Sequence, residues 1–190
     1  PAARADVQHW RACAGAVLTG AGTVLADDPG MDVRLPAAVG VAAGLRVVLD
    51  PQLRALSPLR IRQGGTPTLY LHRPDIAPPA SGVEGVEFAA VEAPAGRLDL
   101  AAVLALLAAR GINEVHVEAG AVLSGAFVAA GLYDELLLYQ APTLLGDQAR
   151  PLLAGLGIEA MEQQQRLQLL DAVALGDDLR LRFVPRLTSD

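Results

Sequence analysis

Two glycine-containing segments of the sequence carry residue types that bind ligands. The first runs from Glu118 to Ala126, where a carboxylate at the end of an expected strand is followed by small residues that open an expected helix. The free N–H groups and positive dipole end of such a helix can hold a phosphate or pyrophosphate. The alternative is an ordinary strand-to-helix turn whose glycines allow close packing. The carboxylate modestly favours a ligand site, because a buried carboxylate needs a partner.

The second segment runs from Thr19 to Pro29 and combines glycines with a hydroxyl group and two carboxylates. The glycines let a ligand approach the backbone, Thr23 offers a hydroxyl group, and Asp27 and Asp28 offer acceptors for sugar hydroxyls. The alternative, that the aspartates only cap or turn the chain, is equally consistent with the spacing. The segment lacks the third glycine of the dinucleotide-binding fingerprint of Rossmann folds.

Two arginines, Arg11 and Arg34, flank this second segment. Guanidinium groups recognise phosphate through paired hydrogen bonds, but surface arginines are common, so either arginine taken alone indicates only a solvated charge. We expect His9 and His116 on exposed or half-buried faces without a catalytic role, and Cys13 as a small packed helix residue. No order of serine, cysteine, histidine and aspartate indicates acyl-transfer chemistry.

The composition excludes several classes of protein. All 15 cationic side chains are arginine, so the chain has no lysine for a Schiff base or a phosphate-binding loop. The net charge of −6 and the aromatic content of 4% are not those of a nucleic-acid-binding protein. One cysteine cannot form an internal disulfide, the three histidines lack the spacing of metal ligands, and no apolar run is long enough to span a membrane. We therefore expect a cytoplasmic protein without a metal site, a nucleic-acid partner or a membrane partner.

Hydrophobic periodicity predicts strands that alternate with helices. Helices are expected over residues 2–13, 98–111 and 122–131, and strands over residues 16–19, 45–50, 66–72, 83–91, 112–120 and 134–146. Residues 20–30 are expected to form a loop with one short helical turn, and residues 167–185 a pair of antiparallel strands. The predicted fold class is α/β, a mostly parallel sheet flanked by helices with a C-terminal antiparallel hairpin. Ligands of such a sheet bind outside the carboxyl ends of its strands, where both segments above lie.

Several stretches, taken in order, resemble one known family. They are residues 4–34 with TVLADDP and a following VR, residues 46–50 (RVVLD), residues 112–153 with VEAG and APTLLG, and residues 173–181. Together they resemble the C-terminal reductase domain of the bifunctional riboflavin-biosynthesis deaminase/reductase. The resemblance implies a dihydrofolate-reductase-like fold and NADPH as the cofactor. It also implies reduction of 5-amino-6-(5-phosphoribosylamino)uracil at C1′ of the ribose, to the ribitylamino product.

The resemblance also implies roles for individual residues. Substrate binding is implied for Arg11, Met31, Arg34 and Glu118. Cofactor contacts are implied for Thr23, Asp27, Gly120, Ala121, Val122, Leu123, Ser124, Gly125 and Ala126. The carboxylate of Glu118 either stabilises positive charge at an opened, iminium-like C1′ or holds substrate hydroxyls, and no residue is assigned as a general acid.

Three features depart from the family pattern. The family's first strand with its loop, and its zinc deaminase domain, have no counterpart in residues 1–190, so we expect a single reductase domain truncated at its N-terminus and without deaminase activity. Pro51 stands where the family commonly has a serine, which weakens one expected cofactor contact. Met31 and Asp32 replace the more usual leucine and threonine.

Two other functions stay open from the sequence. One is a reductase of the same fold acting on a different pterin-like or sugar-phosphate substrate, which would be favoured if Arg11 and Arg34 point away from the cleft. The other is a non-catalytic remnant that binds ligands or forms dimers. For the riboflavin-biosynthesis reductase itself we expect a homodimer, because the apolar composition, 52% of the residues, leaves ample surface for an interface.

Overall fold

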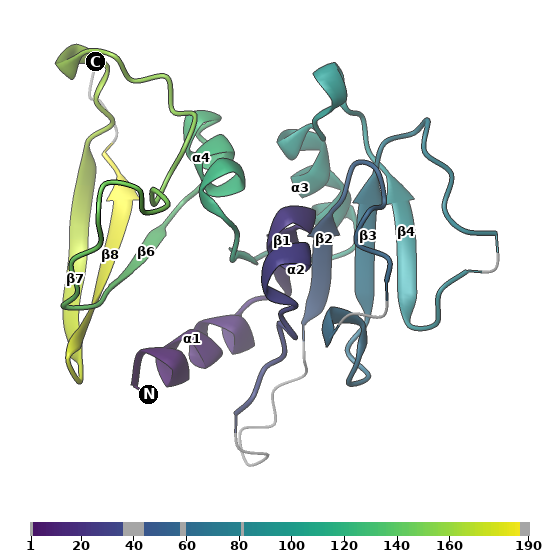
Figure 1. Cartoon of the computed structure of the whole chain (residues 1–190), viewed down its shortest axis with the longest axis horizontal. Helices are drawn as coiled ribbons and strands as arrows, with labels where there is room; N and C mark the ends of the chain where they lie inside the picture. Colours follow the sequence, from purple (N-terminus) through teal and green to yellow (C-terminus); the bar gives the residue numbers. More distant parts are fainter. Residues whose placement is uncertain (1, 36–43, 58–59, 81, 187–190) are drawn as a thin grey trace.

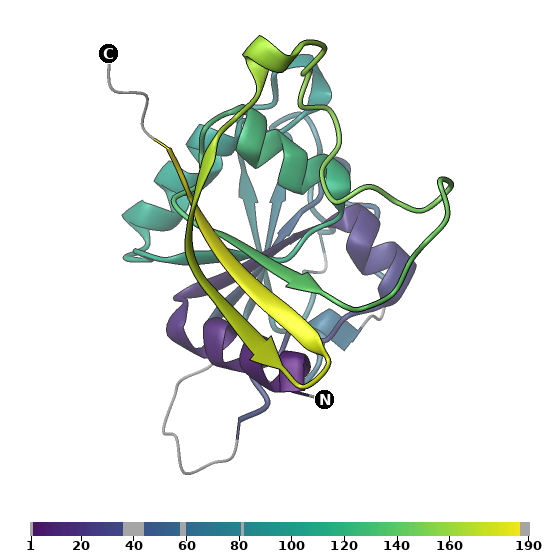
Figure 2. The ribbon, with the colours of Figure 1, turned by 90° about the vertical axis from the view of Figure 1, so that its left-hand side faces the viewer.

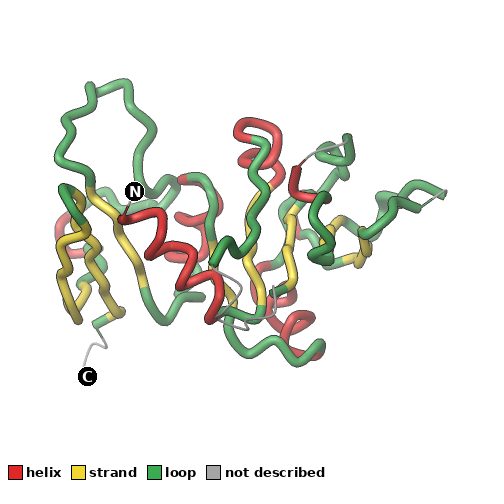
Figure 3. The backbone as a smooth tube through the Cα atoms, turned by 90° about the horizontal axis from the view of Figure 1, so that it is seen from below, coloured by secondary structure: helices red, strands yellow, loops and turns green. Residues whose placement is uncertain are grey.

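The computed structural model describes residues 2–35, 44–57, 60–80 and 82–186. These residues form two β-sheets at opposite ends of the molecule, with helices between and beside them (Figures 1 and 3). One sheet is parallel and the other is antiparallel. The α/β fold expected from the sequence is therefore confirmed.

The parallel sheet has five strands in the order β4-β3-β2-β1-β5. Their bounds are β1 Ala16–Gly20, β2 Leu45–Leu49, β3 Thr68–His72, β4 Val86–Ala90 and β5 Val115–Val117. The three central strands are nearly continuous apolar runs, as both faces of a parallel sheet are covered. Because the strands are parallel, their carboxyl ends meet at one edge, and the loops that follow them can form one site.

Four α-helices accompany the strands. Their bounds are α1 Ala2–Cys13, α2 Ala21–Asp27, α3 Leu100–Ala109 and α4 Ala121–Ala129, with short 3-10 turns at Arg60–Arg62, Pro94–Gly96 and Met161–Gln163. The carboxylate of Asp99 caps α3 by accepting hydrogen bonds from the backbone N–H groups of Ala101 and Ala102. Gly111 follows the helix with a φ of 80°. The helix expected over residues 98–111 is therefore confirmed, with an aspartate N-cap and a glycine after its last turn.

Helix α2 is longer than the single turn expected within residues 20–30. It forms despite Gly22 because Ala21 and Val24 pack in the core, with 3% and 0% of their surface exposed. Tertiary burial thus overrides the low helix propensity of glycine. Asp28 ends the helix in the left-handed region, with a φ of 40° and its backbone N–H bonded to the Val24 carbonyl.

The antiparallel sheet has the order β6-β8-β7. Its strands are β6 Leu136–Gln140, β7 Leu167–Leu175 and β8 Asp178–Pro185. The turn at Gly176, which has a φ of 72°, connects β7 to β8, so the expected hairpin is confirmed. Strands β5 and β6 are shorter than the predicted ranges 112–120 and 134–146. Pro142, which has no N–H group to donate to a ladder, lies two residues after β6. Within the described ranges, no ladder joins the two sheets.

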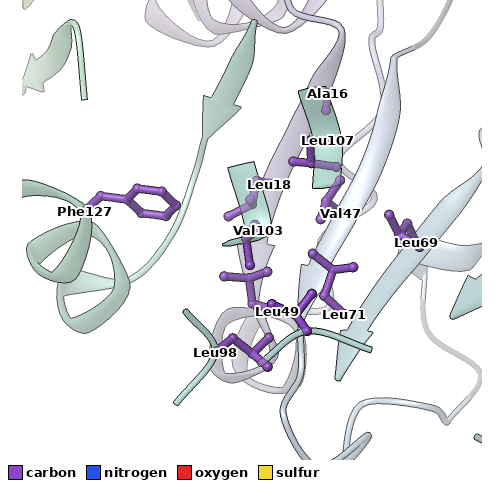
Figure 4. Close-up of a cluster of buried hydrophobic side chains, with 11 residues drawn as sticks. Ala16, Leu18, Val47, Leu49, Leu69, Leu71, Leu98, Val103, Leu107 and Phe127 are labelled. Atoms are coloured by element: carbon purple, nitrogen blue, oxygen red, sulfur yellow. The ribbon is translucent and has the colours of Figure 1, made fainter. Parts of the chain in front are cut away.

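Two clusters of buried side chains cover the two faces of the parallel sheet. Successive residues of β1 point to opposite faces, so Leu18 joins one cluster with Leu107 and Phe127, and Val17 joins the other with Tyr70. Figure 4 shows the first cluster, in which β1, β2 and β3 face α3 and α4. This core fixes the strand ends that precede the site.

A polar network joins α1 to the antiparallel sheet, across whose hairpin end α1 runs (Figure 2). The Asp6 carboxylate accepts hydrogen bonds from Trp10 Nε1 at 3.1 Å, Tyr139 Oη at 2.6 Å and Arg180 Nη1 at 3.0 Å. The guanidinium groups of Arg180 and Arg182 lie 5.6 and 5.0 Å from the centre of the Trp10 ring. Helix α1 is therefore held by cation–π contacts and hydrogen bonds on this side.

Candidate active site

A cleft of about 980 Å³ opens beside the carboxyl ends of the parallel strands. Residues 20–23 and 118–123, which belong to the two glycine-containing segments, line it together. The segments are in contact, because a Cβ atom added at Gly120 would lie 3.7 Å from Thr23 Oγ1, and one at Gly20 would lie 3.2 Å from Leu123 Cδ2. Two segments about 100 residues apart therefore form one site.

An ion pair between Arg11 and Glu118 lies at the wall of this cleft. Arg11 extends from α1 and Glu118 follows β5, where its backbone N–H donates to the Leu18 carbonyl at 2.9 Å. Arg11 Nε and Nη2 donate to the two carboxylate oxygens of Glu118, each at 2.6 Å. The pair is bidentate, and only 10% of the Arg11 side chain and 24% of the Glu118 side chain are exposed. This geometry is the strongest form of a guanidinium–carboxylate contact.

The Glu118 carboxylate is strongly acidic. Burial raises its pKa, but hydrogen bonds and charge from Arg11 and His116 more than offset this, so that the pKa falls to about 2. His116 Nε2 lies 3.2 Å from Glu118 Oε1. Glu118 is thus a fixed negative charge at neutral pH, suited to stabilising a nearby positive charge or accepting hydrogen bonds.

The guanidinium of Arg11 is already occupied by protein groups. Besides the two bonds to Glu118, its Nη1 donates to the Asp32 carbonyl at 3.0 Å and its Nη2 lies 3.8 Å from Met31 Sδ. Met31 is buried, lines the cleft and has a left-handed φ of 53°. Few N–H donors of Arg11 stay free for a phosphate, so its main role here is to orient Glu118.

Arg34 is placed differently from the other residues implied in substrate binding. It is exposed and does not belong to the cleft lining, whereas Arg11, Met31 and Glu118 do. Its backbone N–H donates to Gln8 Oε1 at 2.6 Å. The structure therefore brings together three of the four residues.

The N-terminus of α4 faces the cleft. Its N-cap is Gly120, which supplies no side-chain hydrogen bond, so the N–H groups of the first turn can bind an anion. Thr23, Asp27, Ala121, Val122, Leu123 and Ala126 line the same cleft. This arrangement has the donors that a phosphate group needs.

Ser124 and Gly125 lie outside the cleft lining. The Ser124 hydroxyl donates to the Ala119 carbonyl at 3.2 Å. Gly125 packs against Ala154, where an added Cβ would clash with the Ala154 carbonyl at 2.0 Å. The backbone N–H of Ala154 also donates to the Ala121 carbonyl at 3.0 Å, so Gly125 allows the segment around Ala154 to pack on α4.

Sequence reasoning missed three arginines of the cleft, Arg54, Arg97 and Arg150. All three are exposed and come from loops, where no periodicity indicates that they meet. Their charges make the cleft suited to an anionic ligand. Cys13 also differs from the expectation of a packed residue, because it is exposed, with Sγ 4.0 Å from His9 Nε2.

The described residues contain neither a candidate metal cluster nor a helix that could span a membrane. No cluster of three or more His, Cys, Asp or Glu side chains there has the arrangement of a metal site. None of the helices described is both long and apolar enough to cross a membrane.

Comparisons with known sequences point to one family. The model of the RibD C-terminal domain matches residues 1–181. The riboflavin biosynthesis protein RibD of Bacillus amyloliquefaciens is 34% identical over 97% of this chain, which covers 50% of that protein. The 2,5-diamino-6-ribosylamino-4(3H)-pyrimidinone 5′-phosphate reductase of Methanothermobacter thermautotrophicus is 34% identical over 93% of this chain, which covers 82% of it. The chain thus spans about half the length of this RibD relative and most of the archaeal reductase.

Solved structures agree with these sequence matches. RibD of Acinetobacter baumannii has a TM-score of 0.83 and 38% identity, over 97% of this chain and 51% of that chain. The riboflavin biosynthesis reductase Rib7 of Saccharomyces cerevisiae has a TM-score of 0.74 and 19% identity, over 98% of this chain and 81% of that chain. At the lower identity, the likeness shows a shared fold alone.

Proposed function

We propose that this chain, which belongs to the family of RibD C-terminal domains, uses NADPH to reduce 5-amino-6-(5-phosphoribosylamino)uracil at C1′ of its ribose. One observation carries the proposal: an uncapped helix N-terminus and a buried Arg11–Glu118 pair line the same cleft. The first suits a cofactor phosphate and the second suits a reacting sugar. Because both line one cleft, the cofactor and the sugar would lie side by side, which is the main requirement of hydride transfer.

The residues of the cleft fit a dinucleotide phosphate cofactor. The α4 N-terminus would hold the pyrophosphate, and Thr23 would contact the cofactor from the facing segment. Arg54, Arg97 and Arg150 supply positive charge along the same cleft. Bound NADPH would supply the hydride that reduces C1′.

The substrate is proposed to lie between the cofactor and Glu118. When the ribose ring opens, C1′ carries positive charge, and the ionised carboxylate of Glu118 would stabilise it. The low pKa of Glu118, about 2, supports this electrostatic role over proton donation at neutral pH. The hydride goes to C1′ and a proton goes to the released ring oxygen; Arg11 keeps Glu118 in place throughout.

The proposal is tested by following NADPH oxidation with residues 1–190. Two substrates are compared, the deaminated pyrimidine named above and 2,5-diamino-6-ribosylamino-4(3H)-pyrimidinone 5′-phosphate, on which the archaeal relative is named to act. The wild type should turn over the deaminated compound, and Glu118→Gln should lower kcat on the order of 100-fold. Glu114→Gln, an exposed carboxylate near the start of β5, should keep the wild-type rate.

Other outcomes would contradict parts of this proposal. Turnover of only the diamino compound would reassign the substrate, while an unchanged rate in Glu118→Gln would remove Glu118 from the reaction. Tight NADPH binding without oxidation in the presence of either compound would favour a non-catalytic ligand-binding module.

We propose further that the chain acts in the cytoplasm as a homodimer and as one part of a longer polypeptide. Leu144 and Leu145, adjacent in the loop after β6, are 100% and 76% exposed, which supports an apolar interface. The coverage of about half of RibD supports the longer polypeptide. Sedimentation of the chain at several concentrations tests the dimer.

A further inference from the structure

Arg46 is a charged residue in the interior of the parallel sheet. It lies in β2 and only 1% of its side chain is exposed. It does not line the cleft, so the proposed chemistry does not use it directly. A buried guanidinium is costly unless its N–H groups are paired, so its partners show what it does.

The Arg46 guanidinium fastens two loops. Nη1 donates to the Gly30 carbonyl at 3.1 Å, to Asp32 Oδ1 at 3.1 Å and to the Gln63 carbonyl at 2.9 Å. Nη2 donates to the Thr66 carbonyl. One side chain thus ties the segment after α2 to the connection between β2 and β3.

The segment that Arg46 holds is conformationally strained. Asp28 and Met31 both have left-handed backbone conformations, with φ of 40° and 53°. Residues other than glycine adopt such conformations at a cost, and they persist only where surrounding contacts impose them. The hydrogen bonds of Arg46 to Gly30 and Asp32 lie on either side of Met31 and supply such contacts.

The same segment contacts the proposed site. The carbonyl of Asp32 accepts from Arg11 Nη1, and Met31 Sδ lies 3.8 Å from Arg11 Nη2. Arg11 in turn binds Glu118 through two hydrogen bonds. The contacts therefore run without a break from Arg46 through Asp32 and Arg11 to Glu118.

We propose that Arg46 is a positioning residue of the reductase site. By holding residues 30–32, it sets where Met31 and the Asp32 carbonyl lie, and so fixes the Arg11–Glu118 pair against the substrate. This inference rests on the function proposed above. It assigns a role in substrate positioning to a residue that touches neither ligand.

The test compares Arg46→Met with Arg62→Met in residues 1–190. Arg62 is the control, because this half-buried arginine also donates to a backbone carbonyl, that of Leu56, at 2.5 Å. Arg46→Met should lower kcat/KM for the pyrimidine on the order of 100-fold, mainly through KM. The Kd of NADPH should change less than about threefold, since α4 makes no contact with Arg46 in this network. Arg62→Met should change neither value.

A loss of stability alone would have a different signature. It would lower the rate and the NADPH binding capacity together, in proportion to the folded fraction, with KM unchanged. Wild-type KM in folded Arg46→Met would therefore overturn the proposal. If Arg46→Met does not fold, the same measurement is made with Arg46→Lys and Asp32→Asn. A raised KM in both variants supports the proposal, and a wild-type KM in both overturns it.

Hydrogen exchange gives a readout that does not depend on turnover. In Arg46→Met or Arg46→Lys, amides of residues 28–35 should exchange faster than in the wild type, while those of α3 keep their rates. If the wild type oxidises no NADPH with either pyrimidine, the proposed function fails. Hydrogen exchange still tests whether Arg46 holds the segment that contacts Arg11. Unchanged exchange in residues 28–35 of the variants would contradict that role of Arg46.

Discussion

The two sheets of this molecule are stabilised in different ways. Strands β1, β2 and β3 lie in the core, and Leu18, Val47 and Leu69 are fully buried. In β6, β7 and β8 every side chain is half-buried or exposed, and Leu169 and Leu170 are 52% and 46% exposed. Apolar packing dominates the first sheet, whereas hydrogen bonds and ion pairs connect the second one to α1.

This difference affects the site, because helix α1 contacts both the cleft beside the parallel sheet and the antiparallel sheet. Its Arg11 reaches the cleft beside the parallel sheet, and its Asp6 and Trp10 contact the antiparallel sheet. The closely packed parallel sheet positions Glu118, and the polar contacts of the antiparallel sheet hold helix α1, which carries Arg11. Changes in the two sheets should therefore have unequal effects on stability and on the site.

Truncating one leucine in each sheet should change the free energy of unfolding by very different amounts. Leu18→Ala should lower the free energy of unfolding by about 2–5 kcal/mol, because it leaves a cavity in a closed core. Leu169→Ala, on an exposed face of β7, should change it by less than about 0.5 kcal/mol. Denaturant titration of both variants measures this, and equal losses would show that the antiparallel sheet has an apolar core as well.

Acid should weaken the Arg11–Glu118 contact. The pKa of Glu118 is lowered from 4.5 to about 2 in the folded chain, so its contribution is complete above the unfolded value and is lost as the pH falls through this range. By linkage this amounts to about 3 kcal/mol. The stability difference between wild type and Glu118→Gln should therefore shrink between pH 5 and 2. A difference that stays constant over this range would mean that the carboxylate is not paired.

A smaller effect is expected where α1 meets the antiparallel sheet. Asp6→Asn removes the charge shared with Tyr139 and Arg180, and should cost about 1–3 kcal/mol. Fluorescence of Trp10, the single tryptophan, should change with it because the ring lies beside Arg180. Asp177→Asn in the exposed hairpin turn is the control. An unchanged Trp10 signal in Asp6→Asn would show that α1 is held by other contacts.

Local signals explain how much of the fold the sequence could predict. Asp99 and Gly111 bound α3 through interactions within a few residues, and the β7–β8 turn depends on Gly176 in the same way. Helix α2 could not be predicted at its full length, because Val24 stabilises it only through packing with distant strands. Predictions thus succeeded where neighbouring residues determine the structure.

The sequence predicted several residues of the site, but it did not predict which of them contact each other. The resemblance placed Arg11 and Glu118 at the substrate, yet nothing showed that these residues, 107 positions apart, bind each other. Arg46 looked only like the start of an apolar strand, since its acceptors are mostly backbone carbonyls in aperiodic loops. Arg150 lies in a stretch whose sequence has no clear pattern.

The proposed reaction requires one cleft to hold a nicotinamide cofactor and a ribose phosphate for direct hydride transfer beside Glu118. The most direct measurement uses NADPH deuterated at C4 of the nicotinamide and locates the label in the product by NMR. We expect deuterium at C1′ of the ribityl chain with the wild type, and a rate on the order of 100-fold lower with Glu118→Gln. Product formed without label at C1′ from NADPH deuterated on either face, or equal rates in the two proteins, would contradict it.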